Sequence, residues 1–287
     1  MYNGRMVKTE YPYGQEFPIL KIETELCSAE VSLYGGHLMS WAPKGQKPVI
    51  FMSPNAVFKK GKALRGGIPL CWPWFGKCPE DASQPSHGVA RISTWQLSKQ
   101  EALEDGTLRL LLTLPPQDEL LPSGALVVEL GAALKLNLLT LDVPRAMPYS
   151  AAMHTYFAVS DYEHVAVTGL EDAAFTEYAD DATPHSEDPL IPLGHIDRIY
   201  HPVSDSQEIL IHDPAWQRSI RLVRSGSASV VVWNPGEELA AGMGDLGSEA
   251  ARGFLAVETA AVPAEGLMLR CGETHELAMS IEVIPVA

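Results

Sequence analysis

Short apolar runs separated by glycine and proline extend along the whole chain, and this punctuation limits the possible folds more than any other feature. The 287 residues include 23 glycines and 22 prolines. The runs are rich in leucine and β-branched residues, as strands are, and they cover 108–114, 125–143, 164–170, 229–234 and 275–284. Candidate helices are short and lie at 171–178, 213–219 and 247–252. We therefore expect an all-β sandwich or barrel with a few short helices, forming one domain over residues 1–287.

The composition and charge narrow the class of partner. Hydrophobic residues make up 46% of the chain and charged residues 20%, a balance that excludes a disordered or fibrous protein. The formal net charge of -15 repels phosphate backbones and anionic lipid surfaces, so we expect neither nucleic acid nor a membrane as partner. The polar first residues show no secretory signal, and no apolar run is long enough to span a bilayer. A cytoplasmic location is expected.

The sequence gives no sign of a metal or cofactor. Its four cysteines are too scattered for a disulfide framework or a zinc site, so reduced thiols are expected. The metal-binding pattern HExxH is absent, as are the phosphate loop GxxxxGK[ST] and the dinucleotide fingerprint GxGxxG. We therefore expect neither a bound metal nor a nucleotide cofactor.

Two long segments break the rhythm of strands and turns. Residues 63–95 contain too many prolines and glycines for central strands, and residues 180–201 form a second polar connection. The first segment also carries three tryptophans, two arginines and a histidine. That content favours an ordered rim around a site over disorder.

Two side chains with acid–base chemistry lie in apolar runs. If 151–159 is a strand, His154 and Tyr156 share one face, and a histidine there needs a partner or a ligand. Glu258 is the only charge in 253–262, so it is neutral, pairs with a cation, or faces a cavity. A core histidine bonded to a carbonyl and a glutamate paired with a structural arginine are the alternatives.

The first long segment also offers groups that could bind an anionic sugar. Arg65 precedes two glycines and Arg91 follows another glycine-containing turn, an arrangement that suits phosphate or carboxylate oxygens. Pairing of each arginine with an acidic side chain explains the same residues. The aromatic rings of Trp72, Trp74 and Phe75 could stack on a pyranose or could simply plug the end of the sandwich.

Taken together, seven motifs resemble the hexose-6-phosphate mutarotases, also called glucose-6-phosphate 1-epimerases, of the aldose 1-epimerase superfamily. In chain order they are YGGHLMSW (34–41), RGGIPLCWPWFG (65–76), SHGVAR (86–91), MHTYFAV (153–159), DRIY (197–200), VVVWNP (230–235) and FLAVETAAV (254–262). The resemblance extends from about residue 30 to the C-terminus. It implies a galactose mutarotase-like supersandwich that interconverts the anomers of hexose 6-phosphates without a cofactor.

The resemblance also implies roles for individual residues. His154 would be the general acid and Glu258 the general base. Arg65 and Arg91 would contact the substrate, chiefly its phosphate, and Asp197 would accept hydrogen bonds from sugar hydroxyls. The other expected substrate contacts are Trp72, His87 and Ser86. Many relatives carry glutamine at the position of Ser86, so the shorter hydroxyl would reach less far.

Two other functions explain part of the same pattern. A non-catalytic protein that binds carbohydrate on the same fold would need the aromatic and arginine residues but not the acid–base pair. A glycoside hydrolase would use two carboxylates, for instance Glu258 with Asp197. The loops give no strong signal for a dimer, so a monomer is expected.

Overall fold

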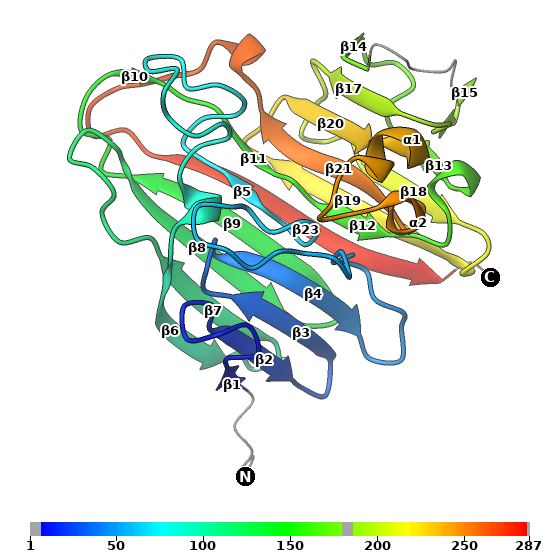
Figure 1. Ribbon diagram of the computed structural model, residues 1–287, viewed down its shortest axis with the longest axis horizontal. Coiled ribbons are helices and arrows are strands. Elements are labelled where there is room, and N and C mark those ends of the chain that lie inside the picture. The colour runs from blue at the N-terminus through cyan, green and yellow to red at the C-terminus, as the bar shows by residue number, and fades with distance from the viewer. Residues whose placement is uncertain (1–6, 180–185, 286–287) are drawn as a thin grey trace.

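The computed structural model describes residues 7–179 and 186–285 and is built mainly of antiparallel strands in three large sheets (Figure 1). The first sheet has four strands, in the order β1 (Val7–Glu10), β2 (Ile19–Glu23), β3 (Cys27–Ser32) and β4 (His37–Pro43). The second has ten strands, in the order β15 (Ser186–Glu187), β16 (Leu190–Ile191), β13 (Ala166–Thr168), β18 (Ile209–Asp213), β19 (Arg218–Ser225), β23 (His275–Pro285), β9 (Leu134–Leu141), β8 (Ser123–Leu130), β7 (Leu108–Thr113) and β6 (Gln96–Ala102).

The third sheet has seven strands and carries the site described below. Its order is β14 (Phe175–Glu177), β17 (Ile196–Tyr200), β20 (Ser229–Asn234), β21 (Phe254–Ala261), β11 (Ala151–Met153) and β5 (Leu70–Cys71), and β12 (Tyr156–Ala158) also pairs with β21. A separate two-stranded ribbon joins β10 (Met147–Pro148) to β22 (Met268–Leu269). The helices are short: α1 (Gly236–Ala241), α2 (Ser248–Ala251) and the 3-10 turns Ala90–Ile92, Tyr162–His164 and Pro263–Glu265.

The four-stranded and seven-stranded sheets both lie against the ten-stranded sheet (Figure 1). One cluster of buried side chains joins all three, with Val31 of β3, Leu136 of β9 and Val257 of β21 among its members. Alternation along the strands produces this core: in β7, Leu108, Leu110 and Leu112 are buried while the intervening side chains are less so. The observed layers confirm the expected all-β sandwich.

Strand β21 departs from this alternation because every one of its eight residues is buried. Leu255 and Val257 face the main core. Phe254 and Ala256 face the opposite way, into a second cluster that includes Leu246, between α1 and α2. The outer face of the seven-stranded sheet is therefore covered near α1 and α2, and Glu258 lies farther along the same face.

Some local predictions were wrong. Residues 171–178 form a turn followed by β14, and residues 213–219 cover the end of β18, the turn at 214–217 and the start of β19. Pairing with β17 and between β18 and β19 decides the structure of these two segments. The third predicted helix, 247–252, is confirmed by α2, and α1 was missed. The second long segment contains β15, β16 and β17 where we expected a loop, although residues 180–185 lie outside the described residues.

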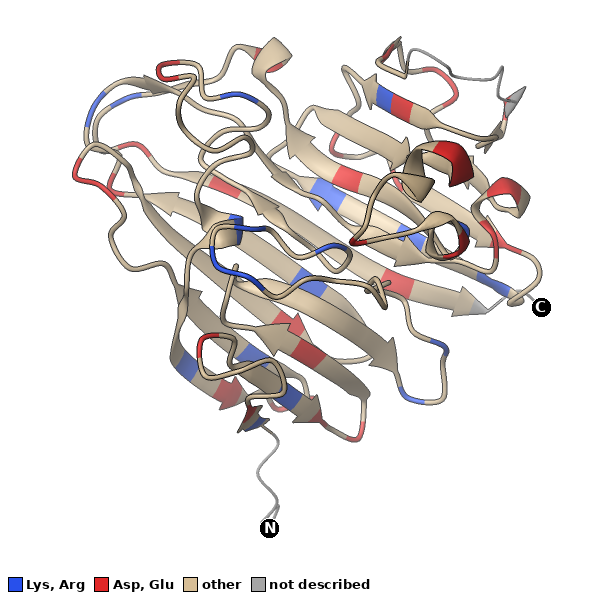
Figure 2. Cartoon of the chain, in the orientation of Figure 1, with Lys and Arg blue, Asp and Glu red and all other residues tan. Residues whose placement is uncertain are grey.

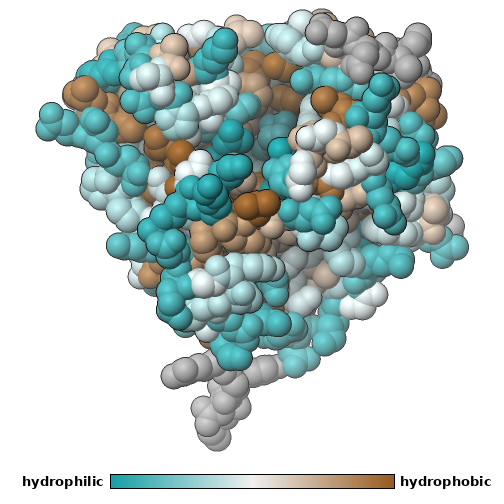
Figure 3. Space-filling view, viewed as in Figure 1, coloured by the Kyte–Doolittle hydropathy of each residue, from teal (hydrophilic) through white to brown (hydrophobic). Residues whose placement is uncertain are grey.

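The surface is mixed in polarity. Figure 2 shows acidic positions on both short helices, and Figure 3 shows polar residues over most of the same face, interrupted by smaller hydrophobic patches. Over residues 7–179 and 186–285, no helix has both the length and the apolar character needed to cross a bilayer.

Candidate functional site

A cavity of about 970 Å³ opens on the outer face of the seven-stranded sheet. Strands β12, β14, β17, β20 and β21 form one wall, and the irregular segment from Lys62 to Arg91 forms the other. The two walls are called the strand wall and the loop wall below. The volume of the cavity is typical of small-molecule sites.

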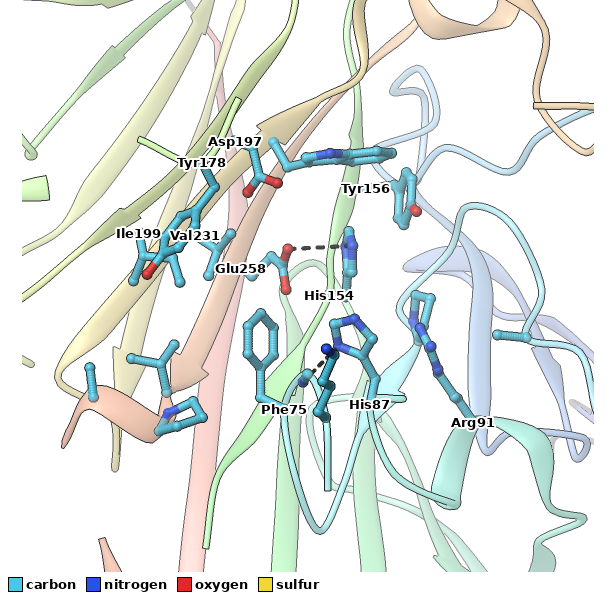
Figure 4. A pocket seen from close by; sticks show the side chains of 18 of the residues that line it. Phe75, His87, Arg91, His154, Tyr156, Tyr178, Asp197, Ile199, Val231 and Glu258 are labelled. Carbon is cyan, nitrogen blue, oxygen red and sulfur yellow. Dashed lines mark hydrogen bonds and ion pairs between the residues drawn. The ribbon is translucent and has the colours of Figure 1, made fainter. Parts of the chain in front are cut away.

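The strand wall brings together the two acid–base residues that the sequence singled out. His154 lies in the short break between β11 and β12, where its backbone N–H donates to the carbonyl of Pro69 at 3.0 Å. Its Nε2 is 3.4 Å from Oε1 of Glu258, which projects from β21 (Figure 4). Both line the cavity, with 14% of the histidine side chain and 2% of the glutamate side chain exposed.

Burial disfavours the charged form of each member of this pair. It raises the pKa of Glu258 well above its usual range, with the negative charge of Asp197 adding to the effect and Arg91 opposing it. Burial also lowers the pKa of His154 well below its usual range, assisted by His87 and Arg91. Near neutral pH, the pair as a whole is therefore expected to carry one transferable proton.

Aromatic rings surround the imidazole. The rings of His154 and Tyr156 stack with centroids 4.7 Å apart and planes 10° apart, so the two side chains share a face as predicted even though the strand is interrupted between them. Trp233 of β20 meets the imidazole edge-on at 5.7 Å. Neither Nδ1 of His154 nor Oε2 of Glu258 has a hydrogen-bond partner within the described residues.

On the loop wall, the two predicted arginines differ in their partners. The guanidinium of Arg65 donates from Nε to Oδ1 of Asp245 at 3.3 Å and from Nη1 to the hydroxyl of Tyr156 at 3.1 Å. Arg91 donates from Nη2 to the carbonyl of Ser86 at 3.0 Å, and it has no carboxylate partner in the described parts of the chain. Both arginines line the cavity, as do Lys62 and Lys77.

His87 and Asp197 also line the cavity, on opposite sides of the acid–base pair (Figure 4). Nδ1 of His87 accepts a hydrogen bond from the backbone N–H of Gly76 at 3.3 Å, and burial, with help from Arg91, lowers its pKa to about 4. The neutral ring then carries its proton on Nε2. Asp197 faces Trp233 across the β17–β20 ladder, and burial raises its pKa.

Two of the expected substrate contacts do not reach the cavity. Trp72 is fully buried in the main core, and its indole N–H donates to Oγ1 of Thr140 at 2.9 Å. The Ser86 hydroxyl donates to the carbonyl of Gly76 at 3.2 Å, and Ser86 is not one of the lining residues. Of the three aromatic residues proposed as a stacking floor, only Phe75 lines the cavity.

Several residues that line the cavity were not predicted from the sequence. Trp233 lies inside the quoted motif VVVWNP, and Tyr156 inside MHTYFAV, so the signal was present but was not assigned. Lys77 and Asp245 carried no recognisable pattern. Among the residues that the structure describes, no group of three or more histidine, cysteine, aspartate or glutamate side chains is arranged to hold a metal ion.

Comparison with known proteins places the chain in a family. Residues 18–282 match the family model described as aldose 1-epimerase. The chain is 33% identical over 250 residues to an Escherichia coli (strain K12) protein named "Putative glucose-6-phosphate 1-epimerase", covering 85% of this chain and 83% of that one. A protein of the same name from Cenchrus ciliaris is 31% identical over 304 residues, covering 98% of this chain and 88% of the relative.

The solved structures agree with the sequence comparisons. A crystal structure described as "a putative mutarotase" from Salmonella typhimurium superposes with a TM-score of 0.86 at 28% identity, covering 99% of this chain and 95% of that one. The resemblance inferred from the motifs is thereby confirmed. With a family match over residues 18–282 and a buried pair of His154 and Glu258 lining its cavity, the chain belongs to the aldose 1-epimerase family.

Proposed function

We propose that this protein interconverts the α and β anomers of hexose 6-phosphates, with D-glucose 6-phosphate as a substrate. One observation carries the proposal: His154 and Glu258 form a buried pair at 3.4 Å, and that pair lies in an open cavity beside Arg91, a cation without a carboxylate partner in the described residues. The names of the relatives from Escherichia coli and Cenchrus ciliaris support the same substrate.

The reaction needs one base and one acid. Glu258 as carboxylate removes the proton of the C1 hydroxyl, while His154 as imidazolium donates its proton to the ring oxygen. The C1–O5 bond breaks and the C1 oxygen becomes an aldehyde. Rotation about the C1–C2 bond, followed by the reverse proton transfers, closes the ring as the other anomer. The protein then holds the same number of protons as before.

The electrostatics of the pair suit this exchange. Ring opening converts carboxylate and imidazolium into carboxylic acid and neutral imidazole, so both states contain one proton. Burial raises the pKa of Glu258 and lowers that of His154, and both shifts stabilise the second state relative to the first, which favours ring opening. General acid–base catalysis of this kind supplies on the order of 10² to 10⁴-fold in rate.

The loop wall supports a phosphorylated substrate. A phosphate dianion entering a protein of net charge -15 needs local cations. Within the described residues the guanidinium of Arg91 bonds only to the carbonyl of Ser86, so its other N–H groups can bind the anion, and Lys77 adds a second positive charge on the same wall. A neutral hexose would not need these cations. His87 and Asp197 are proposed to bind the sugar hydroxyls, as donor and acceptor respectively.

Anomer exchange measured by two-dimensional exchange NMR tests the proposal. We expect the protein to accelerate exchange of glucose 6-phosphate over the spontaneous rate and to act more weakly on glucose. An assay for new reducing ends on oligosaccharides serves as the comparison, because a hydrolase would produce them. Binding of glucose 6-phosphate without accelerated exchange would instead identify a non-catalytic binding protein.

A further inference from the structure

The His154 imidazole has little to fix the plane of its ring through hydrogen bonds. Its Nε2 faces Glu258, and its Nδ1 has no partner within the described residues. A functional histidine is usually oriented by a hydrogen bond to the nitrogen that does not react. No side-chain or backbone group of the described residues makes that bond, and the neighbouring aromatic rings are the contacts that hold the imidazole in place.

Tyr156 supplies one of these contacts. Its ring lies parallel to the imidazole, with the centroids 4.7 Å apart, and only 2% of the residue is exposed. Phe254 packs against the tyrosine ring at 4.9 Å, and Trp233 meets it edge-on at 5.9 Å. The ring plane of Tyr156 therefore fixes the ring plane of His154.

The tyrosine hydroxyl is held in turn by Arg65, and Arg65 by Asp245. The Arg65 guanidinium donates to the hydroxyl of Tyr156 at 3.1 Å and to the carboxylate of Asp245 at 3.3 Å. Asp245 lies in the turn between α1 and α2, whose backbone is itself anchored: Ser53 donates to the carbonyl of Asp245 and Asn55 to that of Leu246, both at 2.7 Å. The carboxylate therefore projects from a fixed position.

Resting on the proposed function, we propose that Asp245 and Tyr156 are positioning residues of the acid–base pair. Asp245 holds Arg65 against the Tyr156 hydroxyl, and the tyrosine ring held in this way keeps the His154 imidazole aligned with Glu258. Asp245, Arg65 and Tyr156 are called the bracket below. Arg65 thus acts mainly in holding the proposed acid in place, whereas Arg91 is available to bind the anion.

Two substitutions test the bracket at its two ends. Tyr156→Phe keeps the stacked ring and removes the hydroxyl, and Asp245→Ala removes the carboxylate while leaving the backbone anchors of its turn intact. Because the phosphate ligands are untouched, we expect each to lower kcat roughly tenfold with KM changed by less than about twofold. Asp245→Asn, which keeps an acceptor for Arg65, is expected to retain most of the activity.

The double variant distinguishes this bracket from two unrelated structural effects. If both residues act through Arg65, the combination Tyr156→Phe with Asp245→Ala loses no more activity than Asp245→Ala alone. Tyr162→Phe is the matched control, because Tyr162 is also buried and its hydroxyl bonds to Glu163, away from the cavity. It should leave kcat and KM unchanged. Losses that multiply in the double variant, or that appear in KM, would overturn the proposal.

A readout that needs no substrate separates this proposal from the proposed function. The imidazole of His154 stacks on the tyrosine ring with the centroids 4.7 Å apart, so the NMR signal of its Hε1 proton senses the aromatic ring. That signal can be assigned by its absence in His154→Ala. We expect that signal to shift in Asp245→Ala and in Tyr156→Phe but not in Tyr162→Phe. If the wild-type protein exchanges no anomers, the proposed function fails while this shift still tests the bracket. Accelerated exchange together with unmoved signals would leave the function standing and remove the bracket.

Discussion

The two walls of the cavity are held in different ways. On the strand wall, Glu258 lies in the middle of β21, which pairs with β20 on one side and with β11 and β12 on the other. On the loop wall, close backbone contacts replace the ladder: Gly88, at φ +77°, lies so near Trp72 that a Cβ there would be 1.9 Å from its carbonyl oxygen. Glycine is required at such a position.

This difference corresponds to the chemistry assigned to each wall. A proton-transfer pair benefits from exclusion of water, which shifts both pKa values, and a strand buried on two faces provides that exclusion. A ligand for an anion must keep free N–H groups within reach of solvent, which an irregular segment does more easily. The comparison therefore predicts that substitutions on the strand wall change the rate and those on the loop wall change substrate preference.

The largest effect is expected on the strand wall. Glu258→Gln removes the base and His154→Ala removes the acid, so each should reduce kcat for glucose 6-phosphate exchange by about 10² to 10⁴-fold. Exchange NMR measures the rate, and circular dichroism checks that the fold is retained. His164→Ala is the control, because 73% of that side chain is exposed and it lies outside the cavity. Near-normal exchange in either variant would remove that residue from the mechanism.

A smaller and more selective effect is expected on the loop wall. Arg91→Ala removes charge-assisted hydrogen bonds to the phosphate, each of which contributes about 1.5–3 kcal/mol. The specificity constant for glucose 6-phosphate should fall roughly 10- to 100-fold, with little change for glucose. Arg145→Ala, which breaks a surface pair with Glu80 outside the cavity, is the matched control. Equal losses on the two sugars would contradict a phosphate role for Arg91.

Substitution of Trp72 is expected to change the stability of the protein but not its binding of substrate. Trp72→Phe removes the hydrogen bond to Thr140 and part of a buried side chain, so the free energy of unfolding should fall by about 1–3 kcal/mol. Because Trp72 lies in the core behind the loop wall, KM for glucose 6-phosphate should change by less than about twofold. Urea denaturation and the exchange assay give the two values. A large rise in KM would restore Trp72 to the list of substrate contacts.

The two members of the candidate pair stand out in the sequence, but each kept a structural alternative there, and their acid and base roles came only from the family resemblance. A single carboxylate in an apolar strand is expensive to bury, which marks Glu258 as special, and His154 lies in a similar setting. The all-β fold was predictable for a related reason, since alternation along strands such as β7 and β9 is a local signal.

The rest of the site depends on contacts between distant residues. Arg65 and Asp245 are 180 positions apart, and no local pattern shows that they meet. The direction of Trp72 was equally hidden, because an irregular segment has no period from which the buried side can be read. Sequence reasoning therefore found the groups that do the proposed chemistry but not the contacts that orient them.

The smallest effect is expected in the pH dependence of the free energy of unfolding, to which the two walls should contribute with opposite sign. His37 lies fully buried behind the loop wall, where a Cβ on Gly67 would meet its Nε2, and burial lowers its pKa from 6.5 to about 3. The unfolded chain binds this proton at a higher pH than the folded chain. The contribution of His37 to the free energy of unfolding is therefore complete above pH 6.5 and is lost as the pH falls. The loss amounts to about 1.4 kcal/mol at about pH 5.5.

The contribution of Glu258, on the strand wall, to stability changes with pH in the opposite direction. Burial raises its pKa, so the folded chain keeps a proton that the unfolded chain loses above 4.5, and this contribution to stability falls as the pH rises through the raised pKa. Relative to wild type, His37→Asn should become more stable as the pH falls from about 7.5 to about 5.5. Glu258→Gln should become more stable, relative to wild type, as the pH rises over the same range. Urea denaturation across this range measures both differences, in which the surface carboxylates cancel. Differences of the same sign would mean that His37 is not buried deprotonated while Glu258 is buried protonated, and the electrostatic contrast between the two walls would fail.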